Sequence, residues 1–300
     1  MASKRAVAQP QQSRVRQYYS LTKPGVLYGN VITGVAGFLL GAGYFRTFPV
    51  VLFLATIGGM TLVIASACTL NNVLDQDIDR LMERTKTRVV AHGDISSVQA
   101  AIFAAVLGVV GIIILLLWTN WYVVGVGVFG YVVYVWLYGM LSKRKSIHGT
   151  LVGSISGAMP ILAGYIAVAD RFDVAALLVF LMLFFWQFPE FYSIAIYRRK
   201  EYAAAGVPVM SVVKGVSSTV VQLYVYTLLF VGSTVLLSAF GYTGWVYLVV
   251  MLGLGLYWIR LANEAWTAPD IEAWARRMFH FSLIVLLALS AALSLGVLLP

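Results

Sequence analysis

The chain has 300 residues, of which 61% are hydrophobic and only 11% are charged. Soluble domains carry about 25% charged residues, so this composition excludes an ordinary soluble protein. The formal net charge of +9 could be mistaken for a nucleic-acid-binding signal, but the basic residues occupy short segments between long apolar runs. Cys68 is the single cysteine, which excludes an internal disulfide bond.

Apolar runs of about 20 residues, enough to cross a bilayer as a helix, recur along the whole chain. We predict an all-α, polytopic membrane protein with nine transmembrane helices around a central cavity. A polar, basic tail over residues 1–22 should precede a single transmembrane domain over residues 23–300. The nine expected helices cover roughly 25–45, 49–74, 98–118, 121–141, 149–168, 174–196, 217–239, 243–262 and 278–299.

Three local patterns add detail to the expected helices from the fifth onward. In the fifth expected helix, Gly149, Gly153 and Gly157 recur every fourth residue, so they line one face and permit close helix approach. Pro160 should kink the same helix. The loop over residues 263–277 is amphipathic, and we expect it to lie along the membrane interface.

The distribution of basic residues predicts the orientation. With nine helices, 19 of the 21 Lys and Arg residues fall on the side of the amino terminus, and only Arg46 and Arg171 fall on the other side. Cytoplasmic loops carry an excess of Lys and Arg. We therefore expect a cytoplasmic amino terminus and cytoplasmic loops over residues 80–97 and 197–216. We therefore interpret the positive charge as a signal of topology and as a contact with anionic lipid. We expect no nucleic-acid partner.

An acidic and basic segment, NNVLDQDIDRLMERTKTR, spans residues 71–88 directly after the second expected helix. Read as a helix, it places Asn71, Asp75 and Asp79 within an arc of roughly 80°, each about 6 Å above the last, while Asp77 points elsewhere. Two carboxylates and an amide on one face make an oxygen-rich site. Such a site suits Mg²⁺ that shares its coordination with substrate phosphates and water.

The basic part of this segment could clamp the same phosphates. Its members are Arg80, Arg84, Lys86 and Arg88. The other interpretation is a solvated loop, which is the usual fate of charges after an apolar helix. Position favours function, because Asn71 and Asp75 lie within about a turn of the hydrocarbon edge, where an unpaired acid is costly.

A second charged loop follows the sixth expected helix as the first follows the second, which hints at two related halves closing around one cavity. The sixth helix ends in FFWQFPEFYSIAIYRRKEY. Its Gln187 and Glu190 are polar at membrane depth, and an ionisable group there is expensive without a role or partner. The aromatic residues fit either an interfacial belt or a cavity wall; they are Trp186, Phe188, Phe191 and Tyr192.

Together these features predict a reaction class. Mg²⁺ on acids and basic residues on phosphates fit the loss of diphosphate from a membrane-dissolved prenyl chain. Aromatic faces can stabilise an allylic cation, and a dry cavity keeps water from quenching it. A transporter, and a binding or assembly protein without activity, are the competing classes. The intact Asn71, Asp75 and Asp79 set argues against lost activity.

The same residues carry a family resemblance. The 71–88 segment resembles the NxxxDxxxD signature of the UbiA-type intramembrane prenyltransferase superfamily, and its continuation DxDxxMxRTxxR is similar to the protohaem IX farnesyltransferase (haem O synthase) branch. The resemblance covers nearly the whole chain. Further similar segments are LTKPGVLYGN (21–30), KRKSIHGTLVGSISGAMP (143–160), WQFPEFYSIAIYRRKEYAAAGVPVM (186–210) and WARRMFHFS (274–282).

The resemblance implies farnesyl diphosphate as donor and haem B as acceptor in a bacterial cell membrane. A haem vinyl carbon would attack the farnesyl carbon, and water would complete a hydroxyethylfarnesyl group. Asn71, Asp75 and Asp79 would bind Mg²⁺ and diphosphate, with Asp75 and Asp79 as the metal ligands. The product would pass to haem A synthase or terminal-oxidase assembly. The candidate substrate-binding residues are Arg84, Arg88, Lys143, Trp186, Gln187, Glu190, Tyr192, Arg198 and Lys200.

One departure from the branch concerns Glu190. The branch usually reads WQxPHF, so Glu190 stands where a histidine is expected. A glutamate ligates iron poorly and would repel a haem propionate. The alternative of another prenyl acceptor, such as a quinone precursor or a chlorin, therefore remains open. The remaining histidines are His92, His148 and His280. We expect Glu190 to orient substrate or to close the cavity by hydrogen bonding; a role as a base stays open.

Overall fold

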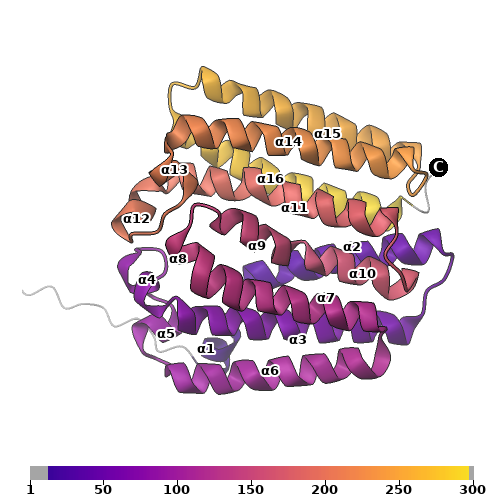
Figure 1. Cartoon of the computed structure of the whole chain (residues 1–300), viewed down its shortest axis with the longest axis horizontal. Helices are drawn as coiled ribbons and strands as arrows, with labels where there is room; N and C mark the ends of the chain where they lie inside the picture. The colour runs from indigo at the N-terminus through magenta and orange to yellow at the C-terminus, as the bar shows by residue number, and fades with distance from the viewer. Residues whose placement is uncertain (1–12, 297–300) are drawn as a thin grey trace, which may run out of the picture.

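The computed structural model describes residues 13–296, so most of the tail predicted over residues 1–22 lies outside the described part. Within residues 13–296, nine helices are long and apolar enough to cross a membrane. They run side by side along one axis (Figure 1). In chain order the spans are α2 (Pro24–Tyr44), α3 (Val50–Leu74), α6 (Ser97–Trp118), Trp121–Lys145, Gly149–Ala169, α11 (Val174–Tyr197), α14 (Gly215–Ala239), Trp245–Trp266 and α16 (Ile271–Leu295). The predicted all-α, multi-pass architecture is confirmed.

Three of these spans are composite. The fourth consists of α7 (Trp121–Val132), the π-helix η1 (Val133–Ser142) and the short α8 (Lys143–Lys145). The fifth divides at Ala158 into α9 (Gly149–Gly157) and α10 (Met159–Ala169). The span is therefore interrupted next to Pro160, as a kink there would require. Pro160 sits in the first turn of α10, where its missing N–H costs nothing. The eighth span consists of α15 (Trp245–Asn263) and the 3₁₀ turn η2 (Glu264–Trp266).

Short helices gather at one end of the bundle, on the left in Figure 1. They are α1 (Arg14–Leu21), α4 (Gln76–Leu81), α5 (Val89–His92), α12 (Arg199–Ala204) and α13 (Met210–Val213). The two charged loops meet there, because Met82 of the first packs with Val207 of the second and with Ile78 of α4 in a small buried cluster. We call this the basic end, since it carries the charged loops over residues 80–97 and 197–216.

The last span begins earlier than expected. Asp270 caps it by accepting a hydrogen bond from the Ala273 N–H at 3.0 Å, and α16 continues from Ile271 to Leu295. Trp274 is buried and donates its indole N–H to the Leu261 carbonyl at 2.8 Å. The prediction of an interfacial loop over residues 263–277 is therefore wrong for its second half, because the capping aspartate and the packing of Trp274 extend the membrane helix.

Small residues bring α2 and α10 close together. A Cβ added at Gly37 would meet the Ile161 backbone, and one at Gly164 would meet the Gly34 backbone. Such close approach is typical of membrane helices, where packing replaces the hydrophobic effect between helices. Gly157 of the predicted glycine face likewise leaves room for the Gln187 side chain of α11.

A cavity of about 760 Å³ lies inside the bundle. Its wall comes mainly from α2, α3, α7 with η1, α9 with α10, α11 and α16. Residues of the two charged loops line its mouth at the basic end. The described residues of α14 and α15 contribute nothing to the wall. The predicted central cavity is thus confirmed. Seven of the nine spans described between residues 13 and 296 line it, α6 through Leu115 alone.

Candidate active site

The acidic segment lies where α3 ends and α4 begins. α3 stops at Leu74, Asp75 occupies the junction, and α4 starts at Gln76, so the expectation of one unbroken helix is wrong. The shared face survives, because the Asp75 N–H still bonds to the Asn71 carbonyl at 3.0 Å and the Asp79 N–H to the Asp75 carbonyl at 2.8 Å. All three side chains are buried and line the cavity at its basic end.

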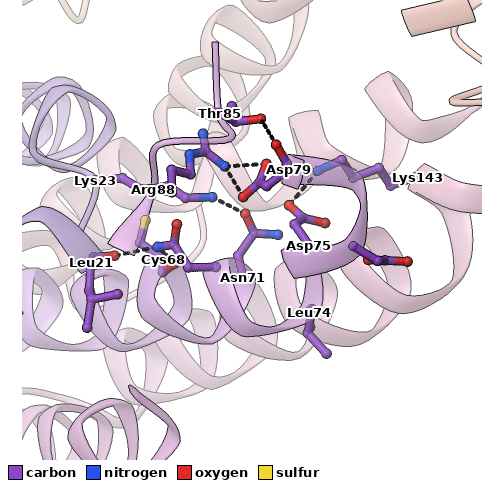
Figure 2. Close-up of polar contacts among 12 residues, drawn as sticks. Leu21, Lys23, Cys68, Asn71, Leu74, Asp75, Asp79, Thr85, Arg88 and Lys143 are labelled. Atoms are coloured by element: carbon purple, nitrogen blue, oxygen red, sulfur yellow. Dashed lines mark hydrogen bonds and ion pairs between the residues drawn. The ribbon is translucent and has the colours of Figure 1, made fainter. Parts of the chain in front are cut away.

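Each member of this set has a cationic partner (Figure 2). Arg88 Nη1 contacts both carboxylate oxygens of Asp79, at 2.7 and 2.9 Å. Lys143 Nζ contacts Asp75 Oδ2 at 2.5 Å, and Lys23 donates to the Asn71 side-chain oxygen. These cations offset the cost of burying two carboxylates. They also concentrate positive charge beside the two carboxylates at this end of the cavity.

Two buried polar atoms of the set have no partner. Asp75 Oδ1 and Asn71 Nδ2 are enclosed, yet neither makes a hydrogen bond with any described residue. Nor do the described residues form a group of three or more His, Cys, Asp or Glu side chains that could hold a metal alone. The unpartnered Asp75 oxygen is a suitable ligand for Mg²⁺. Proteins usually bind Mg²⁺ through one or two carboxylates, and substrate phosphates and water complete its coordination.

Lys23 is a site residue that the sequence reasoning missed. It precedes Pro24 at the start of α2, with a left-handed backbone (φ 51°, ψ 67°) that turns the chain into the membrane helix. Burial and the nearby Arg88 lower the pKa of Lys23 to about 8. The sequence feature that could have identified Lys23 is a lysine immediately before the proline that begins an apolar run. The cavity wall also includes Tyr134 and Tyr138 of η1, whose rings stack with centroids 5.7 Å apart.

The basic residues of the first loop divide into two groups. Arg84 and Arg88 line the cavity. Arg80 instead donates to the Ala91 carbonyl at 3.0 Å, and Lys86 pairs with Glu83 at 2.6 Å on the surface. The expectation that Arg80 and Lys86 clamp phosphates is therefore wrong, because these contacts hold both side chains outside the cavity wall.

Asp77 points away from the set, as the helical reading predicted. It pairs with Arg144 at 2.7 Å, and 66% of its side chain is exposed. The hydrogen bonds from Arg144 lower the pKa of Asp77 to about 2. This pair ties α8 to α4 outside the cavity.

On α11, the candidate residues fall on two sides of the helix. Trp186, Gln187 and Glu190 line the cavity. Trp186 donates its indole N–H to the Ser282 carbonyl at 2.9 Å, and Gln187 donates to the Ser154 carbonyl at 3.0 Å, so their polar atoms join helices. Tyr192 faces α14 instead, where its hydroxyl donates to Gln222 at 2.8 Å. It belongs to a smaller groove and is withdrawn as a substrate contact, because it lies on the opposite side of α11.

Beyond α11, Arg198 lines the cavity and pairs with Glu201 at 2.8 Å. Lys200 is exposed on α12 and does not line the cavity, so its assignment to substrate is also withdrawn. The helix breaks at Arg198, and this break turns Lys200 outward. His92, His148 and His280 are all exposed and outside the cavity wall.

Comparison with known proteins gives the class to which this fold and site belong. The model of the UbiA prenyltransferase family matches residues 30–284. The chain therefore belongs to the UbiA prenyltransferase family, as a multi-pass membrane enzyme.

At the level of individual proteins, the similarity is to one kind of transferase. A protein of Yersinia enterocolitica named protoheme IX farnesyltransferase is 43% identical over 280 residues, 93% of this chain and 94% of that protein. One of Photorhabdus laumondii with the same name is 41% identical over 281 residues, 94% of this chain and 95% of that protein.

Solved structures show the same fold at low identity. One reported for digeranylgeranylglyceryl phosphate synthase in membranes has a TM-score of 0.79 at 18% identity, covering 94% of this chain and 98% of that chain. A UbiA homologue from Archaeoglobus fulgidus bound to GPP and Mg²⁺ has a TM-score of 0.69 at 13% identity, covering 93% and 99%.

Proposed function

We propose that this enzyme transfers the farnesyl group of farnesyl diphosphate to a vinyl group of haem B, giving haem O and diphosphate. The observation that carries the proposal is the match of nearly the whole chain to protoheme IX farnesyltransferases at above 40% identity. The site supports the same chemistry, since it combines a cation-rich acidic mouth with a large apolar cavity.

Asn71, Asp75 and Asp79 would hold Mg²⁺ together with the diphosphate, and the free Asp75 Oδ1 is the oxygen best placed to ligate it. When bound, Mg²⁺ would neutralise the negative charge that develops on the leaving diphosphate. Solved UbiA homologues bound to prenyl diphosphates and Mg²⁺ support this assignment.

The protein's own cations complete the leaving-group site. Lys23, Arg84, Arg88 and Lys143 line the same end of the cavity, where each could donate to phosphate oxygens. Because Arg88 and Lys143 already contact Asp79 and Asp75, one network would bind metal and diphosphate together. Preorganised charge at the point where charge develops is the largest common source of catalysis.

The rest of the cavity would hold the apolar parts of both substrates. Trp186, Tyr134 and Tyr138 present aromatic surface to it, and aromatic faces stabilise a cation. A quinone precursor or a chlorin as acceptor is the alternative that Glu190 keeps open. The acceptor is the part of the proposal that most needs a direct test.

The test is pigment analysis of membranes from a haem O-deficient host that expresses this chain, followed by assay of the purified protein. We expect haem O by mass spectrometry only with farnesyl diphosphate, haem B and Mg²⁺ all present. A double Asp75→Ala, Asp79→Ala variant is the control. Prenylation of a quinone precursor or a chlorin, with haem B left unchanged, would transfer the proposal to the alternative acceptor.

A further inference from the structure

Glu190 is an acid placed well inside the membrane on the cavity wall. It lies seven residues before Tyr197, the last residue of α11. At 1.5 Å per residue, this is about 10 Å from the basic end of the helix. Its neighbours one turn away, Trp186 and Ile194, also line the cavity. Glu190 therefore lies about two helical turns in from the basic end, on the cavity wall.

The Glu190 carboxylate differs from the other acids of the wall. Asp75 is paired with Lys143 and Asp79 with Arg88. Glu190 makes no ion pair or hydrogen bond through its side chain with any residue between 13 and 296. Among these residues it therefore has no partner with which to close the cavity by hydrogen bonding. The expectation that Glu190 orients substrate stays a prediction. An unpaired acid at this depth is costly, which favours a role in the reaction.

The proposed reaction requires one proton acceptor. The allylic carbon of the donor and the vinyl carbons of the acceptor offer no N–H or O–H group, whereas the water that forms the hydroxyl does. Asp75 and Asp79 are engaged by cations at the mouth of the cavity. Resting on the proposed function, we propose that Glu190 holds this water and takes its proton, as the general base of the hydration step.

The step balances without an oxidant or reductant. The C–O bond of farnesyl diphosphate breaks, and its electron pair leaves with the diphosphate. The vinyl π pair forms the new C–C bond, which leaves a cation on the carbon next to the porphyrin ring. A lone pair of water forms the C–O bond to this carbon, and one water proton passes to the Glu190 carboxylate. A cation that is not hydrated would lose a neighbouring proton and give an alkene.

The experiment separates leaving-group loss from hydration. The purified full chain is given farnesyl diphosphate, haem B and Mg²⁺ in ¹⁸O-labelled water, and diphosphate release and haem products are measured together. For Glu190→Gln we expect the ¹⁸O-hydroxylated product to form about 10²–10⁴-fold more slowly, the effect of removing a general base. Diphosphate release should fall far less, and farnesylated haem lacking the elements of water should accumulate.

Two further variants sharpen the result. Glu190→His keeps a proton acceptor and should restore most of the hydroxylated product. Glu272→Gln removes a carboxylate outside the cavity, on the first turn of α16 where it pairs with Arg276 at 3.7 Å, and should behave as the parent.

Two outcomes would overturn the assignment. Hydroxylated product from Glu190→Gln at the parental rate would mean that no base is needed at this position. Equal loss of diphosphate release and product would make Glu190 a substrate-binding residue. Absence of any farnesylated haem from the parent is a different result, since it would contradict the proposed function itself.

Discussion

Asp75 shows how one residue depends on its neighbours. Its side chain is fully buried, with Lys143 on one oxygen and no partner from the described part of the chain on the other. A buried carboxylate is tolerated only when its charge is compensated. Lys143 supplies that compensation from another helix, and the free oxygen is left for a ligand. The same atom therefore links the stability of the fold to the chemistry of the site.

The first prediction concerns the acids. Asp75→Ala and Asp79→Ala should each abolish product formation while the protein still accumulates in the membrane, because each removes a ligand for Mg²⁺ and diphosphate. Asp77→Asn is the matched control. Its carboxylate is exposed and pairs with Arg144 outside the cavity, so activity should change little. Near-normal turnover by both alanine variants would remove the metal–diphosphate assignment.

The second prediction concerns Lys143. Lys143→Met leaves the buried Asp75 carboxylate without its cation, which should cost about 3 kcal/mol of unfolding free energy, the lower end of the range for breaking a buried ion pair. Mg²⁺ should recover more stability in this variant than in the parent, because it can take the vacated place beside Asp75. Thermal unfolding in detergent, with and without Mg²⁺, is the measurement. Equal Mg²⁺ effects in both proteins would argue against metal binding at Asp75.

Among the elements, the spans that bear the site depart most from regular α-helix. α3 breaks at Asp75, and the fourth span changes to a π-helix over Val133–Ser142. π-helical segments often occur at functional sites. Here the segment carries Tyr134 and Tyr138 on the cavity wall and leads directly into Lys143. Irregular backbone is tolerated at membrane depth where it lines a cavity.

The third prediction tests the contact of α2 with α10. Gly164→Ala should lower the free energy of unfolding by about 1–3 kcal/mol, because the new methyl group meets the Gly34 backbone and cannot be relieved by a side-chain rotation. Gly253→Ala, in α15, adds a methyl group with nothing within 4 Å and should be neutral or stabilising. The buried thiol of Cys68 offers a readout, since a thiol-reactive dye reports its exposure on heating. Equal melting temperatures for the two variants would contradict the close packing.

At the scale of the whole molecule, charge and chemistry occupy the same end of the bundle. Both charged loops lie at the basic end in Figure 1, and both contribute residues to the mouth of the cavity. This arrangement would place the polar diphosphate near the membrane surface and the prenyl chain within the apolar depth. Which side of the membrane this end faces remains a prediction from the positive-inside rule.

The fourth prediction tests that orientation. Tags inserted after Gly93 and after Gly206, two glycines with left-handed backbones in the charged loops, should report cytoplasmic exposure. A carboxy-terminal tag should report the opposite side, because nine spans separate the two ends. Protease or reporter fusions in intact cells give the measurement. A carboxy terminus in the cytoplasm would contradict the count of nine spans.

The sequence by itself determined the class of fold, the approximate limits of the nine spans and the acidic set, because apolar length and helical spacing are local properties of the chain. It also placed Trp186, Gln187 and Glu190 at membrane depth. It could not decide which side of α11 faces the cavity, since a helix that is apolar all round carries little directional signal. Tyr192 was misplaced for this reason.

Only the tertiary structure decided which side chains pair with the buried acidic set. Lys143 reaches Asp75 across 68 positions of sequence, and Lys23 reaches Asn71 across 48. No local pattern encodes such contacts, because they depend on how separate helices pack and on which buried charges then need compensation. The same packing left Glu190 without a partner among residues 13–296, which is a property of the assembled cavity and of no single segment.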